Sequence, residues 1–167
     1  MPEKSKLTAD IEIKDLPEMN LACVRHVGPY KGNEALFKKL FTDVFNWAGP
    51  RGLVRFPETR AISVYHDNPE TTEESKSRIS VGITVPEDAE VDGEISKMKI
   101  GGGKFAVARF EINPDQYEDA WNAVKDWFQE SEFEPDDRLC FENYLNNPGE
   151  HPEGKHIVEI CAPVKPR

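Results

Sequence analysis

Short apolar runs, each bounded by turn-forming residues, predict eight strands along the chain. A polar loop from Asp67 to Ser77 separates one pair of them. Gly101-Gly102-Gly103 separates another pair, and we interpret these glycines as a hairpin turn. The predicted strands lie at about Ile11–Lys14, Leu21–Arg25, Ala61–Tyr65, Arg78–Val85, Glu94–Ile100, Lys104–Phe110, Arg138–Leu145 and His156–Pro163.

Apolar residues at helical spacing predict two helices. The first carries a stripe from Leu36 to Phe45 and ends at Gly49-Pro50, because glycine is favoured just after a helix and proline cannot continue one. The second begins at Asn113-Pro114-Asp115-Gln116, where asparagine suits the N-cap, proline suits the first turn, and glutamine follows three residues after the cap. Its apolar stripe consists of Trp121, Val124 and Phe128.

The two halves of the chain align with each other. Arg25 matches Arg109 at an offset of 84 residues, and other residues of the first strands and helix keep the same offset. After the helix the offset is 79, where Tyr65-His66-Asp67-Asn68-Pro69 matches Tyr144-Leu145-Asn146-Asn147-Pro148. Order, element type and terminal motif agree, which predicts a duplicated β-β-α-β-β unit. The first repeat covers about residues 10–86 and the second about residues 92–164.

Each unit is too small to bury one face of a sheet alone. We therefore expect the two units to pack as a single α+β domain over residues 1–167, with an antiparallel sheet and pseudo-two-fold symmetry. Ligand sites favour such seams, so we also expect a central ligand cleft between the repeats.

Three motifs, in order along the chain, resemble the GyrI-like family. This family is also described as the effector-binding domain of AraC-type and MerR-type multidrug-responsive regulators, and as the gyrase inhibitory protein when free-standing. The resemblance covers about Ile11 to Val164 and implies a two-lobed fold. It also implies a central cleft that takes amphipathic, often cationic, aromatic compounds through an acidic residue and surrounding aromatic residues. The motifs are Arg25-His26-Val27-Gly28-Pro29-Tyr30, Tyr65-His66-Asp67-Asn68-Pro69 and Phe141-Glu142-Asn143-Tyr144-Leu145-Asn146-Asn147-Pro148, the last followed by Ile157–Val164.

The charge of the chain argues against direct binding to nucleic acid. There are 21 Lys and Arg against 31 Asp and Glu, a formal net charge of −10, and nucleic-acid binding depends largely on basic residues that neutralise phosphates. Regulators of the resembled group carry a DNA-binding helix-turn-helix domain, whereas about ten residues precede the first predicted strand here. We therefore expect a stand-alone form that binds no nucleic acid directly.

Several absences in the sequence limit its location and chemistry. No apolar run approaches the ~20 residues that a membrane-spanning helix needs. The three cysteines (Cys23, Cys140 and Cys161) are widely spaced in apolar stretches, which favours a reducing cytoplasm. His151 and His156 flank a Pro/Gly loop without a metal-ligand pattern, so no metal and no cofactor are expected.

Glu142 is the sharpest candidate for a functional residue. It lies inside an apolar strand, where alternation places Cys140, Glu142 and Tyr144 on one face. Such a carboxylate either points to water at a sheet edge or is buried beside a cavity, and the residues alone leave both alternatives open. The resemblance favours the cleft, because Glu142 matches the cleft acid of the family.

Aromatic residues are the second candidate feature, since their faces attract cations and supply apolar area. Each of them also suits an ordinary core, which remains the alternative for any one of them. We assign Phe37, Phe41, Val44 and Phe128 to the packing of helices on the sheet. For Tyr30 at the helix entry we favour packing, and the alternative is that its hydroxyl reaches the cleft. The candidate wall residues of the cleft are Tyr65, Tyr144, Trp121, Phe105 and Phe56.

These observations lead to one main hypothesis and two alternatives. The main hypothesis is a stand-alone binding protein that sequesters amphipathic, cationic aromatic molecules without turnover, with Glu142 selecting positive charge. Some stand-alone relatives of the resembled family resemble hydrolases that open cyclopropane rings in DNA-alkylating natural products, and the resemblance implies that Glu142 with Tyr65 or Tyr144 would serve that chemistry. The third possibility is a protein partner, DNA gyrase, inhibited through the acidic surface.

Overall fold

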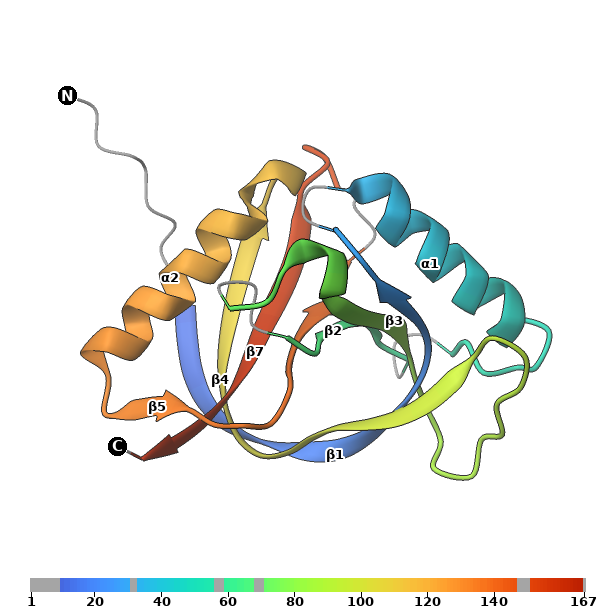
Figure 1. Ribbon diagram of the computed structural model, residues 1–167, viewed down its shortest axis with the longest axis horizontal. Helices are drawn as coiled ribbons and strands as arrows, with labels where there is room; N and C mark the ends of the chain where they lie inside the picture. Colours follow the sequence, from blue (N-terminus) through green and yellow to red (C-terminus); the bar gives the residue numbers. More distant parts are fainter. Residues whose placement is uncertain (1–9, 31–32, 56–58, 68–70, 147–150, 167) are drawn as a thin grey trace.

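The computed structural model describes residues 10–30, 33–55, 59–67, 71–146 and 151–166. This part of the chain forms two helices and seven strands, with short 3-10 turns at Glu74–Lys76 and Pro114–Gln116. The elements are β1 (Asp10–Val27), α1 (Glu34–Ala48), β2 (Ala61–Tyr65), β3 (Arg78–Val85), β4 (Ser96–Ile112), α2 (Tyr117–Glu130), β5 (Phe133–Pro135), β6 (Cys140–Tyr144) and β7 (His156–Pro166) (Figure 1).

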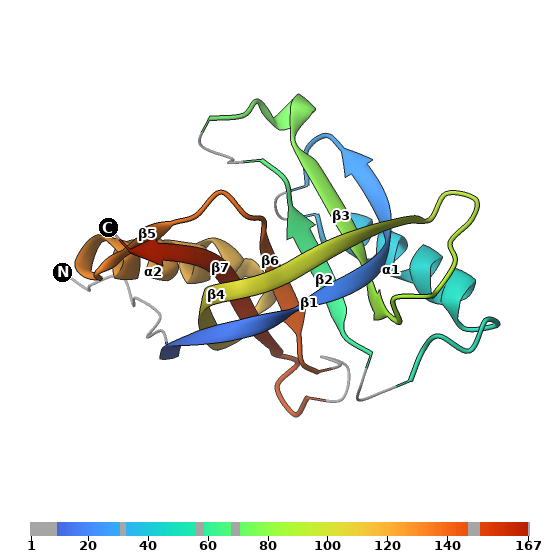
Figure 2. The ribbon, with the colours of Figure 1, turned by 90° about the horizontal axis from the view of Figure 1, so that it is seen from below.

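The strands pair in the order β4-β1-β3-β2-β6-β7-β5, and all the pairings are antiparallel. β4 also pairs with β7, so the ladder closes on itself. Closure is possible because β1 and β4 are long and each has two partners: β1 pairs with β4 over residues 10–23 and with β3 over residues 20–27. Seen from below, β1 and β4 run together across the underside of the molecule (Figure 2). The fold is thus α+β with an antiparallel sheet, as the sequence predicts.

The prediction of a glycine hairpin is wrong. The two strands expected on either side of Gly101-Gly102-Gly103 form one continuous strand, β4, and the two strands expected at Ile11–Lys14 and Leu21–Arg25 form one strand, β1. The three glycines have φ values of +80°, +81° and +115°, so they bend β4 without ending it. Gly101 pairs with Glu18 of β1, and a Cβ atom at Gly101 would lie 2.4 Å from the Pro17 carbonyl oxygen. Glycine is therefore required here by the close approach of β1, and not by a turn.

Both helices bury their predicted apolar stripes against the sheet. α1 packs on β1 and β3, whereas α2 packs on β4 and β5. Just before α2, the Gln116 side chain accepts a hydrogen bond from the Asn113 backbone N–H at 2.8 Å. This bond is part of the capping box that the sequence predicts. The most buried helix residues are Leu40, Val44 and Ala48 on α1 and Ala120, Val124 and Phe128 on α2.

A separate apolar cluster lies on the other face of the sheet, away from the helices. Phe105 and Phe141 form its centre, with ring centroids 5.6 Å apart, and both are at most 1% exposed. The curved middle of β1 and β4 contributes Leu16, Met19 and Ile100 to the same cluster. The face of β2 and β6 that is directed toward the helices is therefore free to carry polar groups.

Within the described ranges, no helix is long and apolar enough to cross a membrane.

Candidate functional site

The pairing of β2 with β6 brings the polar residues of the two strands together. Ser63 lies directly opposite Glu142 in this antiparallel pair. Residues that oppose each other across a ladder share a face, and alternation adds Tyr65 and Tyr144 to it. The register of the central strands thus collects two tyrosines, a serine and a carboxylate on the side of the sheet that faces the helices.

Glu142 is buried, with 2% of its surface exposed, and three side chains donate hydrogen bonds to it. The hydroxyls of Tyr65 and Tyr144 donate to Oε1 at 2.8 and 2.5 Å, respectively. The indole Nε1 of Trp121 donates to Oε2 at 2.6 Å. This burial excludes the alternative in which Glu142 points to water at a sheet edge.

No basic side chain in the described parts of the chain forms an ion pair with Glu142. Burial raises the pKa of the Glu142 carboxyl, and the hydrogen bonds from Tyr144, Trp121 and Tyr65 counteract part of that rise. Burial and the charge of Glu142 also raise the pKa values of Tyr65 and Tyr144 well above the usual value, so both phenols remain protonated donors at neutral pH. The site therefore contains one acidic group, Glu142, whose hydrogen-bond donors are all neutral.

Aromatic rings from both helices surround the carboxylate. Trp121 of α2 meets Tyr65 edge-on, with ring centroids 5.5 Å apart and planes at 82°. Phe41 of α1 meets Tyr144 in the same way, at 5.6 Å and 84°. Tyr30, which precedes α1, lies 5.6 Å from Tyr65, and burial followed by the charge of Glu142 raises its pKa. The cluster therefore lies where residues of α1, α2, β2 and β6 converge.

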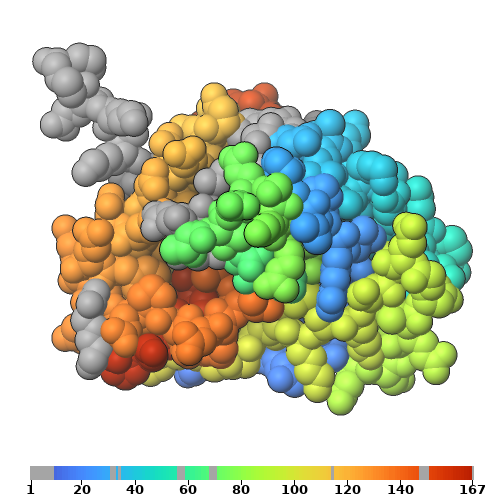
Figure 3. Space-filling view, in the orientation of Figure 1, coloured from blue at the N-terminus to red at the C-terminus, as the bar shows by residue number. Residues whose placement is uncertain are grey.

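The aromatic donors are more exposed to solvent than the carboxylate that they contact. Tyr65, Trp121 and Tyr144 are each partly exposed to solvent, whereas Glu142 is almost completely buried. In the space-filling view, the segment that includes Glu74–Lys76 lies on the front face, with α2 on its left and α1 on its right (Figure 3). The solvent-exposed surface of the site is therefore supplied by the aromatic side chains and not by the carboxylate.

The structure brings three of the five predicted aromatic residues, Tyr65, Tyr144 and Trp121, to Glu142. It does not bring Phe105, which is fully buried against Phe141 on the opposite face of the sheet, because strand alternation directs Phe141 away from Glu142. Phe56 lies outside the described residues.

Phe41 belongs to the cluster although the sequence pattern assigns it to packing alone, and Tyr30 belongs to it although packing is the favoured of its two interpretations. Phe41 is only partly buried and its ring contacts Tyr144. Its position within the apolar stripe of α1 gives no signal of this, because a stripe shows which side of a helix faces inward but not which residue meets the site. The Arg25-to-Tyr30 motif does mark Tyr30, and the contact with Tyr65 gives that motif a role at the site.

Among the described residues, no group of His, Cys, Asp and Glu side chains could hold a metal ion. His151 Nε2 donates to Glu111 Oε2 at 2.5 Å, and His156 Nδ1 forms a hydrogen bond with the Tyr117 hydroxyl at 2.6 Å. Neither of these two hydrogen bonds involves Glu142. The chemistry that these side chains can offer at the cluster is therefore that of a buried carboxylate, hydroxyls and aromatic faces.

The chain is similar to known proteins over nearly its whole length. A family model described as the GyrI-like small molecule binding domain matches residues 9–165. The DNA gyrase inhibitor of Escherichia coli K12 is 30% identical over 163 residues, which cover 93% of this chain and 97% of that protein. Among solved structures, the EcmrR C-terminal domain superimposes with a TM-score of 0.80 at 16% identity, over 96% of this chain and all of that one. The structure of SAV2435 bound to tetraphenylphosphonium gives a TM-score of 0.68 at 14% identity, over 93% and 94% of the two chains. At these low identities the two structures show a shared fold.

Proposed function

The chain belongs to the GyrI-like family of small-molecule-binding domains, and from this premise we propose that it binds amphipathic aromatic cations at Glu142. Tyr65, Trp121 and Tyr144 would form the surface against which the ligand lies, together with Phe41 of α1. Binding proceeds without turnover, so the protein acts by sequestering its ligand.

The observation that carries this proposal is the burial of Glu142 without a basic partner among the residues that the structure describes. Burying an isolated charge is costly unless it is paired or hydrogen bonded. Three neutral donors form hydrogen bonds with the Glu142 carboxylate, but none of them carries a positive charge to balance its negative one. A cation held against the surrounding rings supplies the missing positive charge in a poorly screened environment.

The rings support the same class of ligand. The faces of tyrosine and tryptophan attract cations and also bury apolar surface, so they suit a molecule that is both aromatic and positively charged. Tetraphenylphosphonium, the ligand of a protein with the same fold, is a lipophilic cation of this class.

A structure of the protein soaked with tetraphenylphosphonium tests the proposed location. We expect the cation to lie against Tyr65, Trp121 and Tyr144, with its charge directed at Glu142. A ligand bound elsewhere, or no bound ligand at saturating concentration, contradicts the proposal. Product analysis after incubation with a cyclopropane-containing compound separates sequestration from hydrolysis, because ring-opened product would favour the hydrolase alternative.

We further infer that the domain contains two related halves. Two hairpins are closed by equivalent hydrogen bonds: Asp67 Oδ2 accepts from the Arg78 backbone N–H, and Asn146 Oδ1 accepts from the Ile157 backbone N–H, both at 2.8 Å. Each acceptor lies 11 residues before its donor, and the two pairs are separated by the offset of 79 that the sequence predicts. At the same offset Glu142 corresponds to Ser63, its partner in the β2–β6 ladder, which supports a two-fold axis between them.

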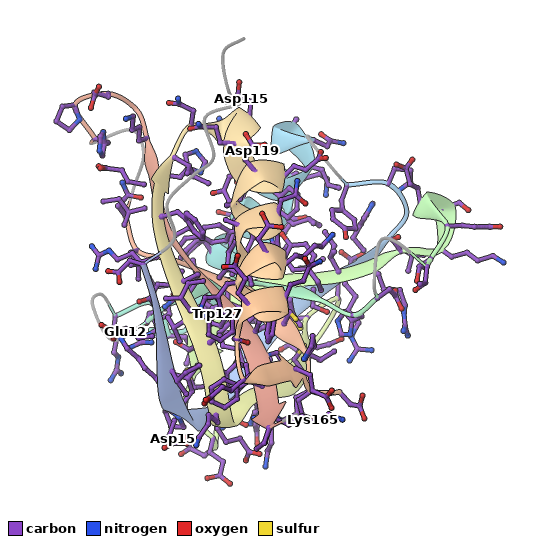
Figure 4. The ribbon with its side chains drawn as sticks, turned by 90° about the vertical axis from the view of Figure 1, so that its left-hand side faces the viewer. Glu12, Asp15, Asp115, Asp119, Trp127 and Lys165 are labelled. Atoms are coloured by element: carbon purple, nitrogen blue, oxygen red, sulfur yellow. The ribbon has the colours of Figure 1, made fainter. Side chains whose placement is uncertain are left out.

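A second candidate function is inhibition of DNA gyrase. The relative from Escherichia coli carries that name, and this chain covers 97% of it. The outward side of α2 carries exposed acidic residues that would suit a basic protein surface, with Asp115 just before the helix and Asp119 in its first turn (Figure 4). A supercoiling assay with purified protein tests this function, and unchanged gyrase activity at excess protein would exclude it.

A further inference from the structure

Ser63 is a fully buried hydroxyl beside the site, and it has no direct role in the proposed ligand contact. It is 0% exposed and lies opposite Glu142 in the β2–β6 ladder. Its Oγ lies 2.9 Å from the Tyr144 hydroxyl oxygen. Because the side chain is short and its backbone is fixed by pairing on both sides of β2, the position of this hydroxyl is well defined.

The Tyr144 hydroxyl contacts two oxygens but has only one proton to donate. Its contact with Glu142 Oε1 is 2.5 Å, whereas its contact with Ser63 Oγ is 2.9 Å. An ionised carboxylate only accepts, and hydrogen bonds to it are shorter and stronger than those between neutral groups. The Tyr144 proton therefore goes to Glu142, and the hydrogen bond between Ser63 and Tyr144 must use the Ser63 proton.

We propose that Ser63 is a positioning residue of the cation site: its hydroxyl donates to the Tyr144 oxygen and so commits the Tyr144 proton to Glu142. This inference rests on the proposed function, in which Glu142 attracts the ligand's charge. The chain of donors runs from Ser63 through Tyr144 to Glu142, while Tyr65 and Trp121 donate to the carboxylate independently.

The hydrogen bonds from Ser63 to Tyr144 and from Tyr144 to Glu142 have two physical effects on the site. A hydroxyl that accepts a hydrogen bond becomes a better donor, so Ser63 strengthens the bond from Tyr144 to Glu142. Ser63 also holds the phenol oxygen in place, which keeps the Tyr144 ring beside the carboxylate and in contact with Phe41. Loss of the Ser63 hydroxyl should therefore weaken the binding of a cation without removing any group that touches it.

The test compares Ser63→Ala with Ser63→Thr, which retains the hydroxyl. Calorimetric titrations use tetraphenylphosphonium as the cationic probe and triphenylphosphine oxide as a neutral probe of related shape. We expect Ser63→Ala to weaken the binding of the cation by about three- to tenfold, the range for one hydrogen bond, and to leave the binding of the neutral probe unchanged. Ser63→Thr should bind the cation within twofold of the natural protein. Equal losses for both probes, or a Ser63→Thr protein as weak as Ser63→Ala, would overturn the inference.

A double-mutant cycle with Tyr144→Phe provides the second measurement. If Ser63 acts through the Tyr144 hydroxyl, Ser63→Ala should have no further effect on cation affinity in the Tyr144→Phe background. Additive losses of cation affinity would contradict the proposal that Ser63 acts through the Tyr144 hydroxyl. Glu142→Gln separates the proposed function from the role of Ser63. Unchanged cation affinity in Glu142→Gln refutes the proposed function and the role of Ser63 with it. A loss in Glu142→Gln with no loss in Ser63→Ala refutes the role of Ser63 alone.

Discussion

The Trp121 indole donates from the middle of α2 to Oε2 of Glu142 in the central strand β6, at 2.6 Å. One hydrogen bond thus joins a helix to the sheet through the carboxylate that we assign to the ligand. Trp121 also meets Tyr65 of β2 edge-on, so it contacts both central strands. The stability of the domain and the charge of its site are consequently coupled at Trp121.

Replacing Trp121 with phenylalanine should therefore destabilise the fold. The substitution retains an aromatic ring but removes the only donor to Oε2 among the described residues, and a buried charged group that loses a hydrogen bond costs about 1.5–3 kcal/mol. Urea denaturation measures the free energy of unfolding. Trp127→Phe is the matched control, because Trp127 lies on the same helix, is partly exposed and stacks on Phe133. Equal losses in the two variants would show that ring size, and not the hydrogen bond, sets the cost.

Glu142 should make the protein less stable as the pH rises. Its pKa is raised by burial, so the folded state binds a proton that the unfolded state has already released in the window between the usual carboxyl pKa and the raised one. Stability falls with pH wherever the folded state binds more protons, and below the usual pKa both states are protonated. The free energy of unfolding of the natural protein, minus that of Glu142→Gln, should decrease as the pH rises through this window. A difference that is flat or increases would contradict the assignment.

Cation binding should have the opposite pH dependence. Protonation of Glu142 removes the negative charge that the ligand requires, so affinity for tetraphenylphosphonium should fall as the pH is lowered through the raised pKa. Triphenylphosphine oxide carries no charge, and its affinity should stay constant over the same range. Parallel titrations of both probes at several pH values check this prediction. If the two affinities change together, the site is unfolding and Glu142 is not the group responsible.

The glycine bend in β4 gives a prediction about the fold. Gly101→Ala should destabilise the protein by about 2–5 kcal/mol, because it adds a positive-φ penalty to a clash with the Pro17 carbonyl. Gly52→Ala is the control: Gly52 also has a positive φ, of +69°, but a Cβ atom there meets nothing within 4 Å. That variant should lose only about 1–2 kcal/mol. Thermal or urea unfolding compares the two, and equal losses would mean that β1 moves aside at Gly101.

Much of the site was predictable from the sequence, because alternation along one strand fixes which residues share a face. This places Glu142 with Tyr144, and the predicted match between the two halves of the sequence then points to Tyr65 as the counterpart of Tyr144. The register between strands has no comparable signal, so the sequence could not show that Phe105 pairs its ring with Phe141 on the other face. Nor could it separate a glycine turn from a glycine bend, since positive φ suits both and only the paired residues of β1 distinguish them.

The most direct test of the account is the charge selectivity of Glu142→Gln. The variant should bind tetraphenylphosphonium more weakly by about 1.5–3 kcal/mol, roughly tenfold to a hundredfold, which is the range for interactions with a buried charged group. It should bind triphenylphosphine oxide as the natural protein does, because the apolar surface of the site is unchanged. Side-by-side calorimetric titrations of the two probes against both proteins measure this difference. Equal losses for the charged and the neutral probe would show that Glu142 shapes the site without selecting charge, and would contradict the account.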